Sequence, residues 1–268
     1  MAGDDMSSYT FLNHPGPIPF AHRGGSLEAP ENSLAAMAHA VDLGYRYLET
    51  DSQQTSDGVL VVLHDATLDR TTDRTGAVAE QTWEQVRGAR LRNPDGSLSD
   101  QTLPRLEELF ETWPDARINV EAKDDRAVEA LVALVRRLDA VERVCLGSFK
   151  GARTATMRAQ LGPRLCTSCG PLDVVRLRLG AIGGLLGKVA ATCAQVPVRQ
   201  KVGPLPLPVV DRAFVKSAHA RGLPVHVWTV DDEAEMRRLL DLGVDGLMTD
   251  RPTLLRQVLV ERGQWSAG

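Results

Sequence analysis

Short runs rich in β-branched residues alternate with longer segments of helical periodicity along most of the chain, and no other feature constrains the fold as strongly. Helical segments span residues 31–43, 126–138, 209–221 and 233–242, and Gly222 and Gly243 follow the last two as helix-ending residues. Strands that alternate with helices form parallel sheets. The strand-like runs end at eight positions, which are Ala21, Asp51, Glu121, Ser148, Ser168, Val198, Thr229 and Thr249. Eight such units predict an α/β fold of the (β/α)₈ barrel type.

One segment interrupts the alternation. The run 59–64 is separated from the strand that ends near Asp51 by Asp57-Gly58, a pair typical of hairpin turns, so we expect it to return antiparallel. Residues from about 65 to 106 are rich in Thr, Asp, Arg and Gly and too numerous for a plain loop in a compact domain. The sequence therefore predicts one domain over residues 1–268, with an inserted cap subdomain at about 65–106. We expect only the first 15 and the last 6 residues to be frayed.

Composition excludes several classes of protein. Hydrophobic residues make up 43% and charged residues 25%, as in globular domains, and a net charge of −4 gives no support to nucleic-acid binding. A small-molecule partner is favoured, and the oligomeric state stays open. No stretch approaches the roughly 18 apolar residues of a membrane helix, and no basic, apolar signal opens the chain, so we expect a cytoplasmic protein without a transmembrane segment.

The cysteines are too few and too clustered for a disulfide framework, which favours a reducing compartment; they are Cys145, Cys166, Cys169 and Cys193. The C-x-x-C pair Cys166 and Cys169 follows a predicted strand and precedes Gly170-Pro171, so we interpret it as strand and loop, not as a redox site at a helix start. The apolar stretch 172–188 is interpreted as core packing near the barrel mouth, with contact to a lipid tail or a transient membrane-surface contact as the alternative.

Ionisable side chains gather where the first strands of the predicted barrel end. Glu49 and Asp51 are two residues apart on one strand and so face the same side, as do Glu121 and Lys123 on the next. Carboxylates that point together repel one another unless a cation neutralises them. Oxygen ligands select a hard cation, so we predict that Glu49, Asp51 and Glu121 hold one divalent cation, Mg²⁺ or Ca²⁺.

Two histidines lie at the same predicted rim. His22 ends the first strand and His64 ends the hairpin return, each beside another ionisable residue. A pair of imidazoles with pKa values near neutrality suits general acid and general base roles at one centre. The remaining histidines lie in the tail, on helices or inside a strand, and we expect structural roles for them; they are His14, His39, His219 and His226.

These clusters resemble, in order and spacing, the motifs of the glycerophosphodiester phosphodiesterase family, within the superfamily of phospholipase-C-like phosphodiesterases. The resemblance covers about residues 19–258. Its motifs are His22-Arg23-Gly24, Pro30-Glu31-Asn32-Ser33, Glu49-Thr50-Asp51, Asp57-Gly58, Leu63-His64-Asp65, Leu68-Asp69-Arg70-Thr71-Thr72, Glu121-Ala122-Lys123, Trp228-Thr229-Val230 and Thr249-Asp250-Arg251-Pro252. Ser33 departs from the threonine usual in the family and keeps a hydroxyl for capping the helix.

The resemblance implies a (β/α)₈ barrel with a small insertion and a metal-dependent hydrolase that releases glycerol 3-phosphate and an alcohol. It implies that His22 and His64 are the acid and base. It also implies that Arg23 and Lys123 contact the phosphate and that Trp228 lines the pocket floor. The metal ligands that it implies are the same three carboxylates.

Two alternatives stay open at this stage. A lysophospholipase D-like or cyclising phospholipase on the same barrel would use the apolar surface around 172–186. A barrel that binds a phosphate ligand without catalysis would lack a histidine or a carboxylate, and this sequence keeps them all.

Overall fold

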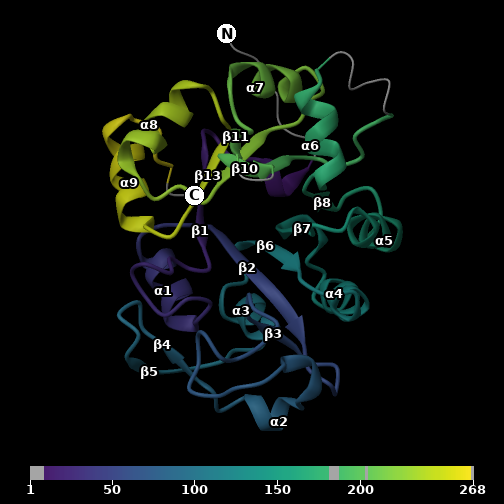
Figure 1. The fold of residues 1–268 in the computed structure, drawn as a ribbon, viewed down its shortest axis with the longest axis vertical. Helices are drawn as coiled ribbons and strands as arrows, with labels where there is room; N and C mark the ends of the chain where they lie inside the picture. Colours follow the sequence, from purple (N-terminus) through teal and green to yellow (C-terminus); the bar gives the residue numbers. More distant parts are fainter. Residues whose placement is uncertain (1–8, 181–186, 203–204, 267–268) are drawn as a thin grey trace.

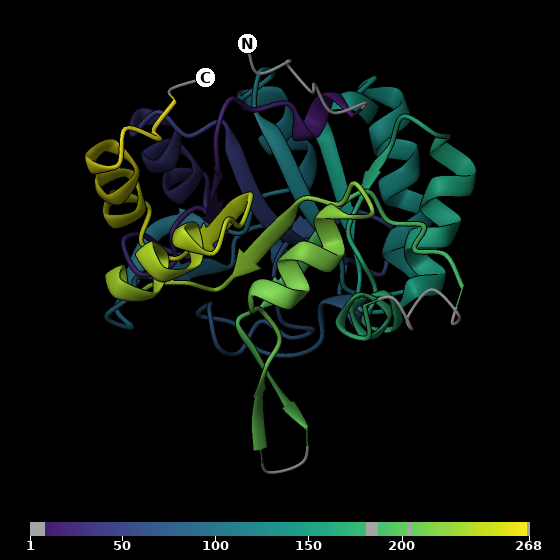
Figure 2. The ribbon, with the colours of Figure 1, turned by 90° about the horizontal axis from the view of Figure 1, so that it is seen from above.

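A computed structural model describes residues 9–180, 187–202 and 205–266. Eight parallel strands form a curled sheet in the order β8-β7-β6-β2-β1-β13-β12-β9 (Figures 1 and 2). They are β1 (Ile18–His22), β2 (Tyr47–Gln54), β6 (Arg117–Ala122), β7 (Val144–Gly147), β8 (Cys166–Thr167), β9 (Ala194–Pro197), β12 (Val225–Trp228) and β13 (Gly246–Thr249). Each of the eight expected strands is present. The two edge strands meet through a single parallel bridge between Ser168 and Cys193.

Helices cover the outer face of this sheet (Figure 2). They are α1 (Leu34–Asp42), α3 (Leu106–Thr112), α4 (Arg126–Arg137), α5 (Gly151–Leu161), α6 (Pro171–Arg178), α7 (Arg212–His219), α8 (Glu233–Asp241) and α9 (Pro252–Glu261). α4 buries Val128, Leu131 and Val135, which recur at the helical spacing that the sequence predicts. Gly222 and Gly243 have positive φ angles of 69° and 84° after α7 and α8, as expected for helix ends.

The hairpin is confirmed. β3 (Leu60–Val62) pairs antiparallel with β2. The following residues form η2 (Val78–Glu80), α2 (Trp83–Val86) and the antiparallel pair β4 (Arg90–Arg92) and β5 (Leu98–Thr102). A separate small core joins Leu68, Val86 and Leu103 to Val61 and Leu63 of the hairpin. These elements lie on the side toward which the β2 arrow points (Figure 1).

Two features differ from the sequence expectation. A second hairpin, β10 (Arg199–Val202) with β11 (Leu205–Pro208), projects away from the body of the molecule after β9 (Figure 2). The described residues nearest the chain ends are packed rather than frayed: Phe11, in η1 (Thr10–Leu12), is 1% exposed against Phe20 and Tyr47, and Trp265 packs on Tyr45. Large aromatic side chains bury enough apolar surface to order short terminal segments.

The four cysteines are free and buried. Cys166 lies in β8 and Cys169 in the loop after it, as expected, but that loop is short, because Gly170 caps α6 and Pro171 is its first residue. A helix therefore begins just after Cys169, contrary to the sequence expectation of a loop there. Within the apolar stretch 172–188, α6 ends at Arg178, and residues 181–186 lie outside the described part. No helix among the described residues is long and apolar enough to cross a membrane.

Candidate active site

The register of the sheet brings the predicted side chains to one place. His22, the last residue of β1, is the Cα partner of Glu49 on β2, and Asp51 is the partner of Glu121 on β6. His22 ends β1 and Glu121 is next to last in β6, whereas Glu49 and Asp51 lie inside β2, which runs on to Gln54. Active sites of parallel β/α barrels are built where strands reach their carboxyl ends, as β1 and β6 do here. The grouping expected from spacing alone is therefore present in three dimensions.

Lys123 lies between two of the carboxylates. Its Nζ atom is 2.9 Å from Asp51 Oδ1 and 2.8 Å from Glu121 Oε2. Burial lowers the pKa of Lys123, but the charges of Asp51 and Glu121 outweigh burial and leave that pKa raised. Asp51 is buried as well, yet the charges of Lys123 and Arg23 hold its pKa below the ordinary value. Both residues are therefore charged near neutral pH.

Glu49 is the least neutralised of the three carboxylates. Burial, together with the charge of Asp51, raises its pKa to about 7 despite the nearby His22. Its Oε2 atom accepts a hydrogen bond of 3.2 Å from the backbone N–H of Arg23. A buried carboxylate beside a second carboxylate offers the oxygen donors that a hard cation prefers.

The three carboxylates do not converge as tightly as a finished metal site. In the described ranges, three or more candidate ligand atoms lie within 4.8 Å of one another only at Cys145, Cys166 and Cys193. The ammonium of Lys123 occupies the space between Asp51 and Glu121 instead. The donor set fits a hard cation by its chemistry, because every donor is a carboxylate oxygen.

His22 is held by a carboxylate that carries no assigned role in the sequence prediction. Its Nδ1 atom lies 2.7 Å from Asp250 Oδ1, and its Nε2 atom lies 3.7 Å from Glu49 Oε2. Burial lowers the pKa of His22, but Glu49 and Asp250 raise it by more. Asp250 follows β13, which pairs with β1 on the side opposite β2. The signal that could have found it is its position at the carboxyl end of the last predicted strand.

His64, just after β3, has a similar partner. Its Nδ1 atom lies 2.6 Å from Asp65 Oδ1, and Arg70 Nε donates to Asp65 Oδ2 at 2.6 Å. Arg70 Nη1 also donates to Glu31 Oε2 at 2.7 Å, and Glu31 in turn accepts from Arg23 Nη1 at 3.1 Å. The charge of His64 contributes to lowering the pKa of Asp51, whereas His22 lies beside Glu49, two residues earlier on the same strand.

Arg23 is placed by an unusual backbone. It has a φ angle of 52°, and a Cβ atom on Gly24 would lie 2.7 Å from Ala36 Cβ, so the loop packs directly on α1. The Nε atom of Arg23 is 3.3 Å from Asp51 Oδ2 but is buried without a hydrogen-bond acceptor. An N–H group of this kind is available to an anionic oxygen. Asn32 Nδ2 donates to Asp51 at 3.3 Å, a contact that sequence reasoning missed.

Trp228 ends β12 and is half-buried. Its ring meets Phe149, in the loop after β7, edge to face with the ring centroids 6.0 Å apart. Phe149 is 58% exposed. The predicted lining residue is thus part of an aromatic pair.

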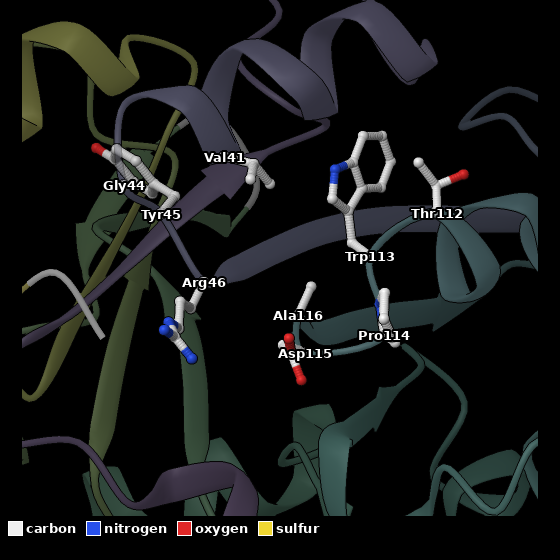
Figure 3. Close-up of a pocket in the computed structure, with 9 residues that line it drawn as sticks. All are labelled: Val41, Gly44, Tyr45, Arg46, Thr112, Trp113, Pro114, Asp115 and Ala116. Atoms are coloured by element: carbon white, nitrogen blue, oxygen red, sulfur yellow. The ribbon is translucent and has the colours of Figure 1, made fainter.

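A pocket of about 400 Å³ lies elsewhere (Figure 3). Its walls come from the residues just before β2 and β6, among them Tyr45, Arg46, Trp113 and Asp115. The pocket therefore opens at the amino ends of those strands, away from the ionisable cluster. In barrels of this type, the face at the amino ends of the strands contributes to stability rather than to chemistry.

A curled parallel sheet with ionisable side chains at its carboxyl rim defines a β/α-barrel enzyme. Residues 22–254 match the model of the glycerophosphoryl diester phosphodiesterase family, and the chain belongs to that family.

Relatives cover almost the full length of the chain. Probable glycerophosphodiester phosphodiesterase 2 of Mycobacterium tuberculosis is 38% identical over 99% of both chains. The glycerophosphodiester phosphodiesterase of Caldanaerobacter subterraneus subsp. tengcongensis is 30% identical over 92% of this chain and 98% of the relative. The crystal structure of a putative glycerophosphoryl diester phosphodiesterase from Silicibacter pomeroyi matches 97% of this chain and 100% of that one, with a TM-score of 0.80 and 26% identity.

Proposed function

We propose that this protein hydrolyses glycerophosphodiesters to glycerol 3-phosphate and an alcohol, with one divalent cation and a pair of histidines. The observation that carries the proposal is that His22 lies beside Glu49 and His64 acts on Asp51, two carboxylates that share one face of β2. Each histidine has its Nδ1 atom held by an aspartate, at 2.7 Å for His22 and 2.6 Å for His64. A carboxylate only accepts hydrogen bonds, so Nδ1 carries a proton and Nε2 is left for proton transfer.

Glu49, Asp51 and Glu121 would hold the cation, Mg²⁺ or Ca²⁺. Burial and the neighbouring charge of Asp51 raise the pKa of Glu49 to about 7, and a bound cation would offset both effects. When bound, the cation neutralises negative charge on the phosphoryl oxygens. Lys123 then faces both the carboxylates and the substrate phosphate.

The substrate phosphate would lie against Arg23 and Lys123. The buried Nε–H group of Arg23, which lacks an acceptor, is suited to a phosphoryl oxygen. Such donors are fixed before the reaction, so they stabilise the charge that gathers on the phosphoryl oxygens in the transition state. Trp228 and Phe149 would border the organic part of the substrate.

We assign the acid role in the first step to His22 and the base role to His64. His22 lies between two carboxylates, which favour its protonated form, whereas Asp65 shares its charge with Arg70. His64 would take the proton from the attacking oxygen, which is water or the glycerol 2-hydroxyl. His22 would give a proton to the departing alkoxide.

Activity assays test the substrate and the cation. Purified protein is incubated with Mg²⁺ or Ca²⁺ and a panel of glycerophosphodiesters and lysolipids, and glycerol 3-phosphate is measured against free alcohol. We expect glycerol 3-phosphate from the deacylated diesters. Preferred cleavage of lysolipids would favour a lysophospholipase D-like enzyme, and no turnover of any substrate would contradict catalysis.

The histidine roles are tested with an activated leaving group. His22→Ala and His64→Ala should each lower kcat by about 10²-fold or more, the range of positioned proton transfer. The p-nitrophenolate group of a p-nitrophenyl phosphodiester leaves without needing a proton. This substrate should therefore restore the rate of His22→Ala and not that of His64→Ala. Rescue of His64→Ala alone would reverse the two roles.

A further inference from the structure

Three cysteines from neighbouring strands meet inside the curled sheet, on the amino-terminal side of the residues assigned to catalysis. Cys145 is the second residue of β7, Cys166 is the first of β8, and Cys193 directly precedes β9. All three therefore lie toward the amino ends of their strands. Cys145 pairs in register with Cys166, and Cys193 forms the bridge with Ser168 that connects the two edge strands.

The distances between the sulfur atoms match those of a metal site. Cys145 Sγ and Cys193 Sγ are 3.9 Å apart, although β8 separates their strands, and all three Sγ atoms lie within 4.8 Å of one another. Only side chains on the inner face of a curled sheet converge in this way. Sulfurs about 2.3 Å from a shared ion lie about 3.8 Å apart in a tetrahedral site and about 4.0 Å apart in a trigonal one.

The surroundings of the cluster are apolar. The three side chains are at most 1% exposed and pack with Phe11, Phe20 and Met248. Thr192 Oγ1 donates a hydrogen bond of 3.2 Å to Cys166 Sγ. A bound cation would supply the counter-charge that thiolate ligands need in so dry a place.

A buried imidazole provides a possible fourth donor. His226 on β12 is 0% exposed, and its Nε2 atom has no hydrogen-bond partner. Its ring packs on Phe20, with the ring centroids 5.0 Å apart, and Phe20 belongs to the same buried cluster as the three cysteines. The His226 nitrogens are not among the atoms that lie within 4.8 Å of one another, so its ring would move toward the ion to become the fourth donor. A buried ring nitrogen without a partner is costly to the fold unless it has a ligand.

We propose that Cys145, Cys166 and Cys193 bind a thiophilic metal ion, Zn²⁺ or Cu⁺, with His226 as the fourth donor if the ion is zinc. Thiolate sulfur selects these ions, and zinc takes three cysteines and one histidine in closed structural sites. Binding releases the thiol protons to solvent. The ion would be structural, because the reacting groups lie at the opposite end of the strands.

The position of the cluster gives the ion a specific effect. β8 has two residues, and one isolated bridge joins it to the strand segment before β9. An ion held by Cys145, Cys166 and Cys193 would tie β7, β8 and this segment together across the seam. Metal-loaded protein should therefore have a higher Tm than metal-free protein, and the difference should keep growing with the free metal concentration after the site is filled.

Because the cluster is buried, the test loads the metal during folding. Wild-type protein is unfolded under reducing conditions without oxygen and refolded with Zn²⁺, with Cu⁺ or without metal. It is then washed with excess EDTA, which strips exposed carboxylate sites, and bound metal is measured by mass spectrometry. We expect about one ion per chain, its loss in Cys193→Ser, and its retention in Cys169→Ser, the matched control at a buried cysteine outside the cluster.

His226→Asn separates the two ions. Loss of bound Zn²⁺ with the variant would assign a four-coordinate zinc site, whereas retention of Cu⁺ would assign a three-sulfur copper site. Wild-type protein that keeps no more metal than Cys193→Ser in either arm would overturn the proposal. Hydrolysis of a glycerophosphodiester reports folding of each variant.

A measurement on wild-type protein alone covers the case in which Cys193→Ser fails to fold. Refolding with Co²⁺ should give the near-ultraviolet sulfur-to-cobalt charge-transfer absorption of a thiolate site. Cys169→Ser should keep that absorption. Its absence from folded wild-type protein would also contradict the proposal.

Discussion

Both histidines of the candidate site are oriented by an aspartate, but the two aspartates are built differently. Asp65 follows His64 in sequence and is itself held by Arg70. Asp250 lies 228 positions from His22, and its backbone N–H donates to Asp231 Oδ1 at 2.8 Å. A contact to Nδ1 fixes both the ring orientation and the tautomer, which makes Asp250 a positioning residue for His22.

Asp250→Asn should lower kcat by about 10-fold or more and leave KM within a few-fold, because in the proposed mechanism His22, and not Asp250, exchanges a proton with the substrate. Steady-state kinetics with a natural diester measures both constants. Asp245→Asn is the matched control. Asp245 forms a similar pair outside the candidate site, where its Oδ2 atom lies 2.7 Å from His219 Nε2. Equal losses of kcat in both variants would mean that Asp250 acts only through stability.

The residues that sequence could predict are those whose neighbours are set by the strand pleat. Glu49 and Asp51 share a face because they are two apart, and the same spacing places Glu121 with Lys123. Asp250 reaches His22 because β13 pairs with β1. The spacing of residues along one strand does not determine which strands pair. The thiol cluster depends on the curvature of the sheet as well, so the sequence does not show that Cys166 lies beside Cys145 and Cys193.

At the scale of elements, several helices begin with a side-chain cap. Asp211 accepts a hydrogen bond of 2.9 Å from Phe214 N at the start of α7, and its hydrogen bond from Arg178 is the first cause of its lowered pKa. A carboxylate whose pKa is lowered by folding stabilises the protein above its unfolded pKa. That contribution is lost as the pH falls through the folded pKa.

Asp211→Ala should therefore cost about 1 kcal/mol of unfolding free energy at pH 7. Asp211→Asn should cost less, because an amide oxygen also caps a helix. The gap in stability between wild type and Asp211→Asn should close as the pH falls below the ordinary aspartate value of 3.8. Denaturant unfolding at several pH values measures this gap, and a gap that widens in acid would contradict the assignment.

Leu68, Val86 and Leu103, within the expected insertion at about 65–106, share a small core with the hairpin residues Val61 and Leu63. Replacing residues 73–101 with a short linker keeps Asp65 and Arg70 in place for His64. We expect the order of preference among glycerophosphodiesters to change more than the Tm, because loops at this rim set substrate choice. Loss of the whole fold would show that the segment is part of the main core instead.

Elements with a strong period were predictable and elements without one were not. α4 repeats its apolar residues at helical spacing, and its predicted bounds agree with the structure within one residue. β10 has basic residues at alternate positions, and β11 has prolines at alternate positions. Prolines disfavour a strand prediction, so the projecting hairpin was missed. β8 was expected, although only two of its residues form the strand.

For the molecule as a whole, the two ends of the strands have different tasks. The carboxyl ends hold the buried charges of the candidate site, which are costly to fold. Phe11 and Leu12 cover the amino ends, where Phe11 packs on Phe20 of β1 and Tyr47 of β2. Stability and catalysis should therefore respond to different substitutions.

Phe11→Ala should lower the unfolding free energy by about 3 kcal/mol, the lower bound for removing a buried phenylalanine, because the ring is 1% exposed. Its kcat should stay within about twofold of wild type at 25 °C, since no catalytic group contacts the ring. Phe149→Ala should do the reverse. Its ring is 58% exposed and meets Trp228 at the opposite end, so the Tm should hardly change while KM for the diester rises. Thermal unfolding and steady-state kinetics on both variants measure the four quantities. If Phe11→Ala lost kcat in proportion to its stability, the two ends would be coupled through the inner layers of the sheet, and the separation of tasks would be wrong.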